Sequence, residues 1–298
     1  MGIHARPLFD IALPADYGSG DALRAVVRLA DRAGFDMFSL TDHPYNPGMY
    51  DAYAGLAYLL GATDNIGAYV SVTNSPLRPA PMLARTVATL SDISNDRFVL
   101  GIGAGGFWDA IVRMGVPRLT PGEAVESFEK SIQLVRDLTG GGPSVTNDLV
   151  QGIQPAPVAT PPIWTGSQGP KSLRVTGRLA DGWVPPNGAD WTTDIVRNGR
   201  AIIDAAAVDA GRDPSDVGTI YKLGGALTPF DLAQTRGPNG LFMGGSSRQW
   251  VEEITTAVRE HGATGFNTSL TDETGAITAD VIQRFGDEVI APARAALG

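Results

Sequence analysis

The stretch Arg97-Phe-Val-Leu-Gly-Ile-Gly-Ala-Gly-Gly-Phe-Trp-Asp109 decides the fold of this chain. Residues 98–102 form an apolar, β-rich run that indicates a buried strand, and a cluster of glycines follows it. Residues 101–106 also match the letters of the dinucleotide-binding fingerprint, Gly-x-Gly-x-x-Gly. A dinucleotide loop and a plain strand end imply different folds and different cofactors, so the context of the run must separate them.

The surrounding sequence favours a strand end. In a dinucleotide fingerprint a helix starts within the motif, and an acidic residue ends the next strand about 20 residues on. Here the next helical pattern begins at about Pro121, and Glu123, which has the right spacing, falls in the start of that helix. An NAD-dependent dehydrogenase built on an open Rossmann sheet therefore remains the lesser alternative.

Short β-rich runs alternate with helical patterns along the whole chain. The predicted strands are residues 8–13, 36–40, 65–72, 98–102, 163–165, 182–184, 219–223 and 264–269. The predicted helices are residues 21–33, 52–61, 81–90, 121–138, 171–180, 192–210, 246–261 and 279–296. Strands separated by helices require parallel pairing, and eight such units predict an α/β fold, a (β/α)8 TIM barrel. We expect a single domain over residues 1–298, with an irregular excursion around residues 140–162 and a loop over residues 228–245.

Composition narrows the class of protein. The net charge of −9 and a pI near 4.8 argue against a nucleic-acid partner. The absence of cysteine excludes disulfides, thiolate metal ligands and a cysteine nucleophile. His4, His43 and His261 lie far apart without a His-x-x-x-His pair, so we expect no metal site. No signal-peptide pattern and no run approaching a membrane span occur, which predicts a cytoplasmic protein without a membrane partner.

Polar residues follow the second and third predicted strands, where a barrel places its functional face. His43, beside Asp42, has the chemistry to donate a proton or a hydrogen bond near neutral pH. It is equally compatible with a solvated loop histidine that Asp42 holds. Ser71, Thr73 and Asn74 are suited to bind the edge of a heterocycle, or to satisfy local backbone groups.

Two glycine-rich segments follow the fourth and fifth strands. Residues 101–106 would let a flat ligand lie against bare backbone, or would only permit a tight turn. Residues 166–169, Gly-Ser-Gln-Gly, precede a helix and offer backbone N–H groups to an anion, unless Ser167 simply caps that helix. Five aromatic residues at strand ends would line an apolar pocket or plug the barrel: Tyr45, Phe107, Trp108, Trp164 and Trp183.

Three blocks of this sequence resemble the luciferase-like superfamily of flavin- and deazaflavin-dependent oxidoreductases, which are TIM barrels. The first is Ala-Gly-Phe-Asp at 33–36 with Thr-Asp-His at 41–43. The second runs from 65 to 105 and includes Leu-Arg-Pro-Ala-Pro-Met-Leu-Ala-Arg at 77–85 and the glycine run. The third is Pro-Ile-Trp-Thr-Gly-Ser at 162–167 with Ala-Asp-Gly-Trp at 180–183. Beyond residue 185 the resemblance is mainly one of architecture.

The resemblance implies that coenzyme F420 or FMN binds at the carboxyl ends of the strands, with its phosphate near residues 166–169. It implies His43 and its neighbour Asp42 as catalytic residues, with Asp109 as a secondary candidate because Gly106 stands where some members carry a catalytic glutamate. It also implies a non-prolyl cis peptide at Val70-Ser71. The expected cofactor-binding residues are Val70, Ser71, Thr73, Gly103, Ala104, Gly105, Thr165, Gly166, Ser167, Gln168 and Gly169.

The resemblance also implies partners and leaves the chemistry open. With F420 the protein would transfer hydride to or from a small organic substrate, whereas FMN supplied by a separate flavin reductase would imply monooxygenation. A homodimer is expected, for which Ala84, Val87 and Leu90 are either an interface or part of the core. A barrel that binds a flavin without catalysis is the alternative from another class.

Overall fold

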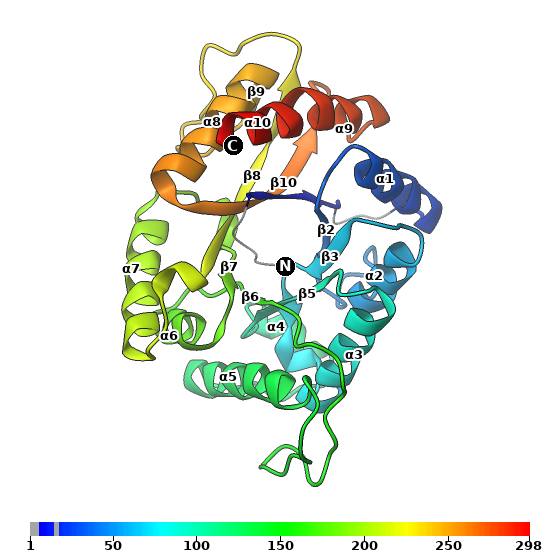
Figure 1. The fold of residues 1–298 in the computed structure, drawn as a ribbon, viewed down its shortest axis with the longest axis vertical. Coiled ribbons are helices and arrows are strands. Elements are labelled where there is room, and N and C mark those ends of the chain that lie inside the picture. The colour runs from blue at the N-terminus through cyan, green and yellow to red at the C-terminus, as the bar shows by residue number, and fades with distance from the viewer. Residues whose placement is uncertain (1–5, 15–17) are drawn as a thin grey trace.

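The computed structural model describes residues 6–14 and 18–298, and its strands close into a parallel barrel (Figure 1). Each strand pairs with the next, and the last, β10, returns to pair with β1. In ring order the barrel strands are β1 (Leu8–Ala12), β2 (Met37–Leu40), β3 (Gly67–Val70), β5 (Phe98–Gly103), β6 (Ile163–Thr165), β7 (Gly182–Trp183), β8 (Gly218–Thr228) and β10 (Ala263–Thr271). This confirms the predicted (β/α)8 barrel, because a Rossmann sheet would stay open.

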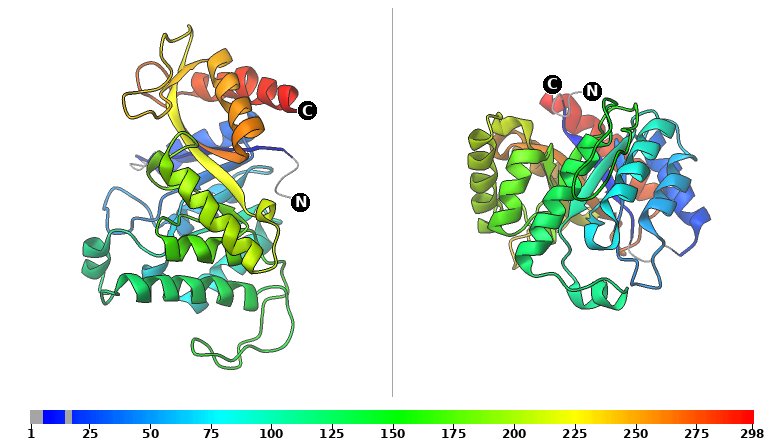
Figure 2. Two further views of the ribbon diagram at one scale, coloured as in Figure 1. Left: turned by 90° about the vertical axis from the view of Figure 1, so that its left-hand side faces the viewer. Right: turned by 90° about the horizontal axis from the view of Figure 1, so that it is seen from below.

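Helices surround the barrel (Figures 1 and 2). They are α1 (Gly20–Arg32), α2 (Ala52–Leu60), α3 (Ala80–Ile93), α5 (Pro121–Asp137), α6 (Pro170–Leu179), α7 (Asp194–Asp209), α8 (Ser247–His261), α9 (Ala279–Phe285) and α10 (Ala291–Leu297). The predicted last helix is thus interrupted, by a π-helical turn at Gly286–Ile290. Pro292 lacks the N–H that would continue the α-helical ladder, which accounts for the interruption.

The predicted start of the first helix after the glycine run was wrong. Helix α4 (Trp108–Arg113) begins directly after Phe107 and is only six residues long, too short to show a helical period in the sequence. The predicted loop at 228–245 also contains a short strand, β9 (Gly244–Ser246), which pairs with the extended end of β8. Residues 140–162 contain no helix and project from the barrel beyond α5 (Figure 2), as expected for an excursion.

Large aromatic side chains fill the inside of the barrel and the layer between the strands and the surrounding helices. Trp164 is fully buried inside the barrel, where its ring meets that of Tyr69 at 4.8 Å. Trp183 is also fully buried and packs so closely on α7 that a Cβ at Gly199 would lie 2.7 Å from its ring. These two tryptophans therefore support the core rather than a pocket. Of the two interpretations of Ala84, Val87 and Leu90, the structure supports core packing, because all three are buried in the core of the protein.

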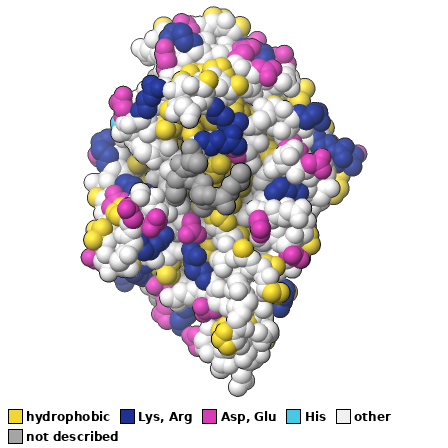
Figure 3. Space-filling view, in the orientation of Figure 1, with side chains coloured by type: hydrophobic (Ala, Val, Ile, Leu, Met, Phe, Trp, Pro, Cys, Tyr) yellow, Lys and Arg dark blue, Asp and Glu magenta, His cyan; other side chains and the backbone are white. Residues whose placement is uncertain are grey.

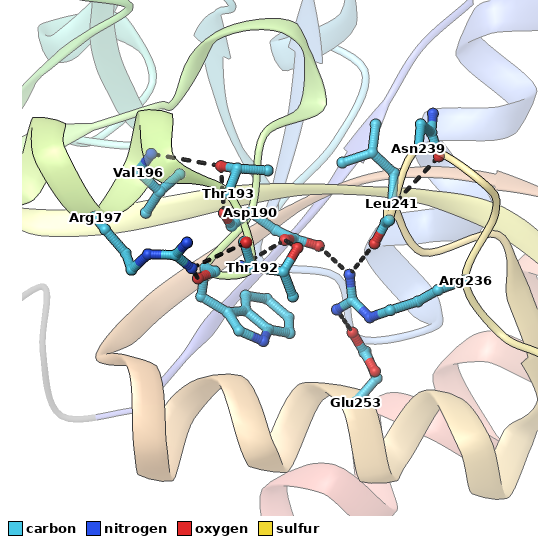
Figure 4. Close-up of polar contacts among 11 residues, drawn as sticks. Asp190, Thr192, Thr193, Val196, Arg197, Arg236, Asn239, Leu241 and Glu253 are labelled. Atoms are coloured by element: carbon cyan, nitrogen blue, oxygen red, sulfur yellow. Dashed lines mark hydrogen bonds and ion pairs between the residues drawn. The ribbon is translucent and has the colours of Figure 1, made fainter.

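A network around Arg236 anchors the loop between β8 and β9 (Figure 4). The Arg236 guanidinium donates to Asp190 at 2.7 Å, forms an ion pair with Glu253 of α8, and lies 5.2 Å from the Trp191 ring. It also donates to the Gly240 carbonyl at 2.6 Å within its own loop. We call Arg236, Asp190, Glu253 and Trp191 the Arg236 clamp. The clamp fixes a loop that has little regular structure of its own.

Surface charge is mixed on the face shown in Figure 3, where basic and acidic side chains are scattered among one another. Within residues 6–14 and 18–298, no helix is both long and apolar enough to cross a membrane. In the same ranges, no three His, Cys, Asp or Glu side chains gather in a way that could hold a metal ion. His4 and the extreme N-terminus lie outside the described residues.

Candidate functional site

A cavity of about 570 Å³ opens at the carboxyl ends of β2, β3, β5 and β6, and we call it the mouth cavity. It is lined by residues from all of the predicted site segments. Those named from the sequence are Asp42, His43, Ser71, Thr73, Asn74, Gly103, Ala104, Gly105, Gly106, Phe107, Trp108, Gly166, Ser167, Gln168 and Gly169. The fold thus brings together residues that are more than 100 positions apart in the sequence. Val70, Thr165 and Asp109 do not line it.

His43 lies at the rim of the mouth cavity, half-buried between two aromatic rings. Its Nδ1 is hydrogen-bonded to the hydroxyl of Tyr45, and its ring meets the edge of Phe107 at 5.2 Å between centroids. Burial lowers the pKa of His43 below its ordinary value, and the nearby Asp42 charge opposes this shift. A neutral imidazole held at Nδ1 presents Nε2 as the ring atom for a ligand.

Asp42 does not hold His43, contrary to one alternative from the sequence. Its fully buried carboxylate accepts from Arg78 at 2.6 and 3.2 Å and from the Asn74 backbone N–H at 3.0 Å. Arg78 also pairs with Asp51 at 2.7 Å and lies 4.9 Å from the Tyr53 ring. We call Arg78, Asp42, Asp51 and Tyr53 the Arg78 clamp. Asp42 therefore ties the loop that bears His43 to the third-strand segment.

The third strand is interrupted where the sequence predicts a special peptide bond. The cis bond lies at Ser71-Val72, one position after the predicted Val70-Ser71, between β3 and the short strand β4 (Thr73–Asn74). Val70 is fully buried in the outer core and so cannot contact a ligand, which corrects its assignment. Ser71 Oγ and Asn74 Oδ1 are buried and have no hydrogen-bond partner among the described residues. Both belong to residues of the mouth cavity.

The side chain of Val72 explains why glycine stands at positions 103 and 166. A Cβ at Gly103 would lie 3.0 Å from Val72 Cγ2, and a Cβ at Gly166 would lie 2.8 Å from the same atom. Only glycine leaves room for the stiff valine side chain between the fourth and fifth strands. Gly105 has a φ of +88° and packs on Pro76, whereas Gly106 has no neighbour within 4 Å of a Cβ. The glycine run therefore serves packing as well as access to the cavity.

The segment 166–169 leads into α6 without a side-chain cap. The N-cap is Gly169, and no side chain caps it, so the capping role considered for Ser167 was wrong. Ser167 Oγ instead donates to the Ser172 carbonyl at 3.2 Å and accepts from Thr176 at 2.9 Å. Thr165 is fully buried with its hydroxyl 2.7 Å from that of Thr176, which keeps it from the cavity. An anion here would meet the backbone N–H groups of the first turn.

Asp109 lies outside the site. It is the second residue of α4, whose buried face consists of Ala110 and Ile111, and its side chain is 93% exposed. It forms an ion pair with Arg118. Its assignment as a secondary catalytic residue is not supported by this position.

Lys222 of β8 is a site residue that the sequence analysis missed. It is half-buried and lines both the mouth cavity and an adjoining cavity. Burial lowers the pKa of Lys222, and the Asp10 charge opposes this shift. A single lysine within the apolar run 219–223 was the available signal, because lysine is rarely buried without a purpose.

Residues 8–227 match the sequence model of a family described as luciferase-like monooxygenase. The 5,10-methylenetetrahydromethanopterin reductase of Methanolobus tindarius is 32% identical over 198 residues, 64% of this chain and 56% of the relative. The F420-dependent glucose-6-phosphate dehydrogenase of Microbacterium testaceum is 27% identical over 210 residues, 65% of this chain and 61% of the relative. The chain thus matches less than two thirds of the length of each.

Solved structures show the same architecture. The coenzyme F420-dependent tetrahydromethanopterin reductase of Methanopyrus kandleri superposes with a TM-score of 0.78 at 18% identity, covering 97% of this chain and 99% of that one. An EDTA monooxygenase from Chelativorans sp. gives 0.74 at 13% identity, covering 98% and 94%. At these identities the likeness establishes the fold.

Proposed function

Because this chain belongs to the luciferase-like monooxygenase family, we propose that it is an oxidoreductase whose mouth cavity binds reduced coenzyme F420. The observation that carries the proposal is the convergence of His43, two unpartnered polar atoms and an uncapped helix start on one cavity. The relative from Microbacterium testaceum, whose name states F420 dependence, supports this choice of cofactor. The whole activity and its substrate are part of the proposal.

The residues present fit a deazaflavin. Ser71 Oγ and Asn74 Oδ1 offer hydrogen bonds to the polar edge of a heterocycle, since buried polar atoms need partners. The start of α6 after Gly169 offers N–H groups to a phosphate. When bound, F420 supplies a hydride to an organic acceptor.

The protein's own part is to bind, orient and exchange a proton. Nδ1 of His43 is engaged by Tyr45, so Nε2 is the atom that would exchange a proton or a hydrogen bond with the ring of the bound cofactor. The Arg78 clamp fixes the backbone on which His43 stands, through Asp42 and Asn74. The Phe107 ring lies nearly perpendicular to the imidazole, 5.2 Å away between centroids, and so supports the orientation of His43.

The proposal is tested by titrating the purified protein with F420 and separately with FMN, following cofactor fluorescence. Saturable F420 binding is expected, and failure to bind either cofactor would refute the proposal. His43→Asn should lower turnover by about 10²–10⁴-fold with cofactor binding nearly unchanged. His261→Asn is the matched control, because His261 stacks on Trp191 at 5.5 Å and does not line the mouth cavity, so turnover should persist.

Monooxygenation with reduced FMN is the second candidate, which the description of the family favours. It would require a separate flavin reductase as partner. Oxygen consumption that depends on reduced FMN and on an organic substrate would select it over the F420 reaction. A cofactor spectrum that shifts on binding, without turnover of any hydride donor or acceptor, would indicate a barrel that only binds.

We also propose a homodimer. Its interface would use the exposed apolar side chains around α3 and the excursion, rather than the buried residues of α3. These are Met82, Leu149 and Ile153, which border a surface groove of about 450 Å³. Light scattering of the wild-type protein and of Met82→Asp tests this, since the charge should shift a dimer towards monomer.

A further inference from the structure

A second cavity adjoins the mouth cavity. Its volume is about 660 Å³, and it lies at the ends of β1, β2, β8 and β10. The two cavities share three residues: Thr41, Ser71 and Lys222. The predicted cofactor residues of 103–105 and 166–169 line only the mouth cavity, and so does His43. Apart from Ser71, which lies at the boundary, the proposed cofactor contacts therefore leave the second cavity as open space beside the cofactor site.

The lining of the second cavity is divided into a polar and an apolar part. Ser39, Asn267 and Lys222 contribute polar groups from three strands. Leu13, Leu270 and Ile277 contribute apolar surface. Among the described residues that line it, Lys222 is the sole charged side chain. This lining suits an organic molecule with an apolar part and a carbonyl or carboxylate oxygen, and disfavours a cation.

A buried carboxyl group lies beneath this lining. Asp10 of β1 accepts at Oδ2 from Ser39 Oγ and from the Tyr69 hydroxyl, both at 2.9 Å, and from the Asn267 amide. Its Oδ1 is buried and has no hydrogen-bond partner within the described residues. Asp10 and His43 are the titratable groups coupled electrostatically to Lys222. Asp10 raises the pKa of Lys222, whereas burial lowers it.

We propose that the second cavity is the substrate subsite and that Lys222, at the boundary between the two cavities, gives a proton to the oxygen of a carbonyl substrate bound there. The proposal rests on the function proposed above, because that function supplies the hydride. Lys222 is thereby a catalytic residue, and Asp10 is a positioning residue that acts through it.

The proton and electron balance is complete. The carbonyl carbon gains a C–H bond from the hydride of the reduced cofactor, which is oxidised, and the π-electron pair moves to the carbonyl oxygen. That oxygen forms an O–H bond as an N–H bond of the Lys222 ammonium breaks. Lys222 is left as a neutral amine and regains a proton from water. Burial lowers the pKa of Lys222, because it favours the neutral amine, and so makes its ammonium group a better proton donor.

The chain offers a direct test because it contains only three lysines: Lys130, Lys171 and Lys222. Trace acetylation of the wild-type protein with acetic anhydride across pH 6–11, read by peptide mass spectrometry, reports each amine separately. Lys222 should reach half-maximal labelling at a lower pH than Lys130, whose pKa is raised by hydrogen bonds to Asp148 and Glu126. A Lys222 midpoint equal to or above that of Lys130 would overturn the proposal.

Ligand probes test the cavity in the same assay. Octanoate, with an anionic oxygen group and an apolar tail, should slow acetylation of Lys222 at least about fivefold and leave the exposed Lys171 unchanged. Octyltrimethylammonium has the same tail and the opposite charge, and should not protect. Protection by neither probe, or equal protection by both, would contradict a subsite governed by Lys222.

Variants separate this inference from the proposed function. Asp10→Asn should move the Lys222 labelling midpoint to lower pH by on the order of one unit, because it removes a nearby negative charge. Lys222→Met should bind F420 as the wild type does and lose at least about 100-fold in turnover of a series of alkanals and alkan-2-ones. Lys222→Arg should not restore the rate, because a guanidinium does not release its proton.

Failure of the proposed function and failure of the proposed role of Lys222 give different experimental results. If the wild type binds no F420, the proposed function fails. If it binds F420 and reduces a carbonyl probe while Lys222→Met keeps the full rate, only the role of Lys222 fails. Unaltered circular dichroism and F420 binding confirm that the variant is folded, and the labelling experiments need no variant at all.

Discussion

The Arg78 clamp and the Arg236 clamp are built from the same parts. Each places an arginine near the face of an aromatic ring, against one aspartate that is almost fully buried and a second acid that is more exposed. The buried aspartates, Asp42 and Asp190, have side-chain exposures of 0% and 1%. The outer acids, Asp51 and Glu253, have exposures of 46% and 16%. Chemistry alone does not distinguish the two clamps.

The surroundings of the two clamps distinguish them. Asp42 precedes His43 and lines the mouth cavity, so the Arg78 clamp fixes a residue that faces the cavity. The Arg236 clamp joins the loop after β7, the loop after β8 and helix α8, and none of its members lines the mouth cavity (Figure 4). A buried arginine–carboxylate network therefore identifies a rigid point of the fold. Whether that point serves function depends on what is attached to it.

The strongest test removes the buried aspartate of each clamp. Asp42→Ala and Asp190→Ala should each lower the free energy of unfolding by about 3–5 kcal/mol, because each removes the buried partner of a partly buried guanidinium and leaves only the more exposed acid. Only Asp42→Ala should also reduce turnover and weaken F420 binding. Urea unfolding and fluorescence titration measure the two effects.

Asp194→Ala provides the control for a surface pair. Its carboxylate is exposed, and its ion pair with Arg197 should be worth at most about 1 kcal/mol. Equal loss of cofactor binding in Asp42→Ala and Asp190→Ala would show that the clamps do not differ in function.

Asp10 sharpens the comparison, because it is a buried carboxyl with no arginine partner among the described residues. Burial raises its pKa from 3.8 to about 6, so the folded chain keeps a proton that the unfolded chain loses between these values. This contribution to stability is fully present below about pH 4 and is lost as the pH rises through 6, in total about 3 kcal/mol.

Asp10→Asn should lack this dependence. The difference in unfolding free energy between the variant and the wild type should shift in favour of the variant by about 2–2.5 kcal/mol from pH 4 to pH 7, measured by urea unfolding. A constant difference over this range would show that Asp10 is not proton-linked to folding.

The sequence predicted one clamp partly and the other not at all. Asp42 stands at a strand end beside a histidine, where barrel geometry alone assigns it to the functional face. Asp190, Arg236 and Glu253 lie in loops and on a helix surface without a local pattern, and Arg236 is 46 residues from Asp190. Their pairing depends on how two loops cross in space, which periodicity does not encode.

The same limit applies within the site. The alternation of β-rich runs with helical patterns predicted all eight barrel units, although β6 and β7 are too short to show a period of their own. The resemblance placed the cis bond one residue too early, at Val70-Ser71, whereas it lies at Ser71-Val72. The close fit of Val72 against Gly103 and Gly166 joins residues far apart in the sequence, which no local pattern encodes. The cavity beside Lys222 depends on side chains from four strands, so only the isolated lysine itself could be noticed.

A smaller loss of stability is expected where Val72 packs against Gly166 in the mouth cavity. Gly166→Ala should destabilise the fold by about 1–3 kcal/mol and weaken F420 binding, because the new methyl group would overlap Val72. Gly106→Ala is the matched control, with open space at the Cβ position, and should change stability by no more than about 0.5 kcal/mol. If both variants behave alike, the packing of Val72 does not shape the site.

The outer acids should give the smallest effects. Asp51→Asn keeps the cap of α2, since asparagine also accepts from the Ala54 N–H, and removes only the half-exposed ion pair with Arg78. The expected loss is at most about 1 kcal/mol and should shrink in 1 M salt.

Glu253→Gln should cost slightly more and depend less on salt, because Glu253 is less exposed and burial raises its pKa. Urea unfolding at low and high salt measures both variants. If Asp51→Asn cost as much as Asp42→Ala, the exposed carboxylate would hold Arg78 as firmly as the buried one. The ion pairs of Arg78, and not the burial of Asp42, would then stabilise the loop that bears His43. Burial of the aspartate would no longer explain why each clamp stabilises its loop.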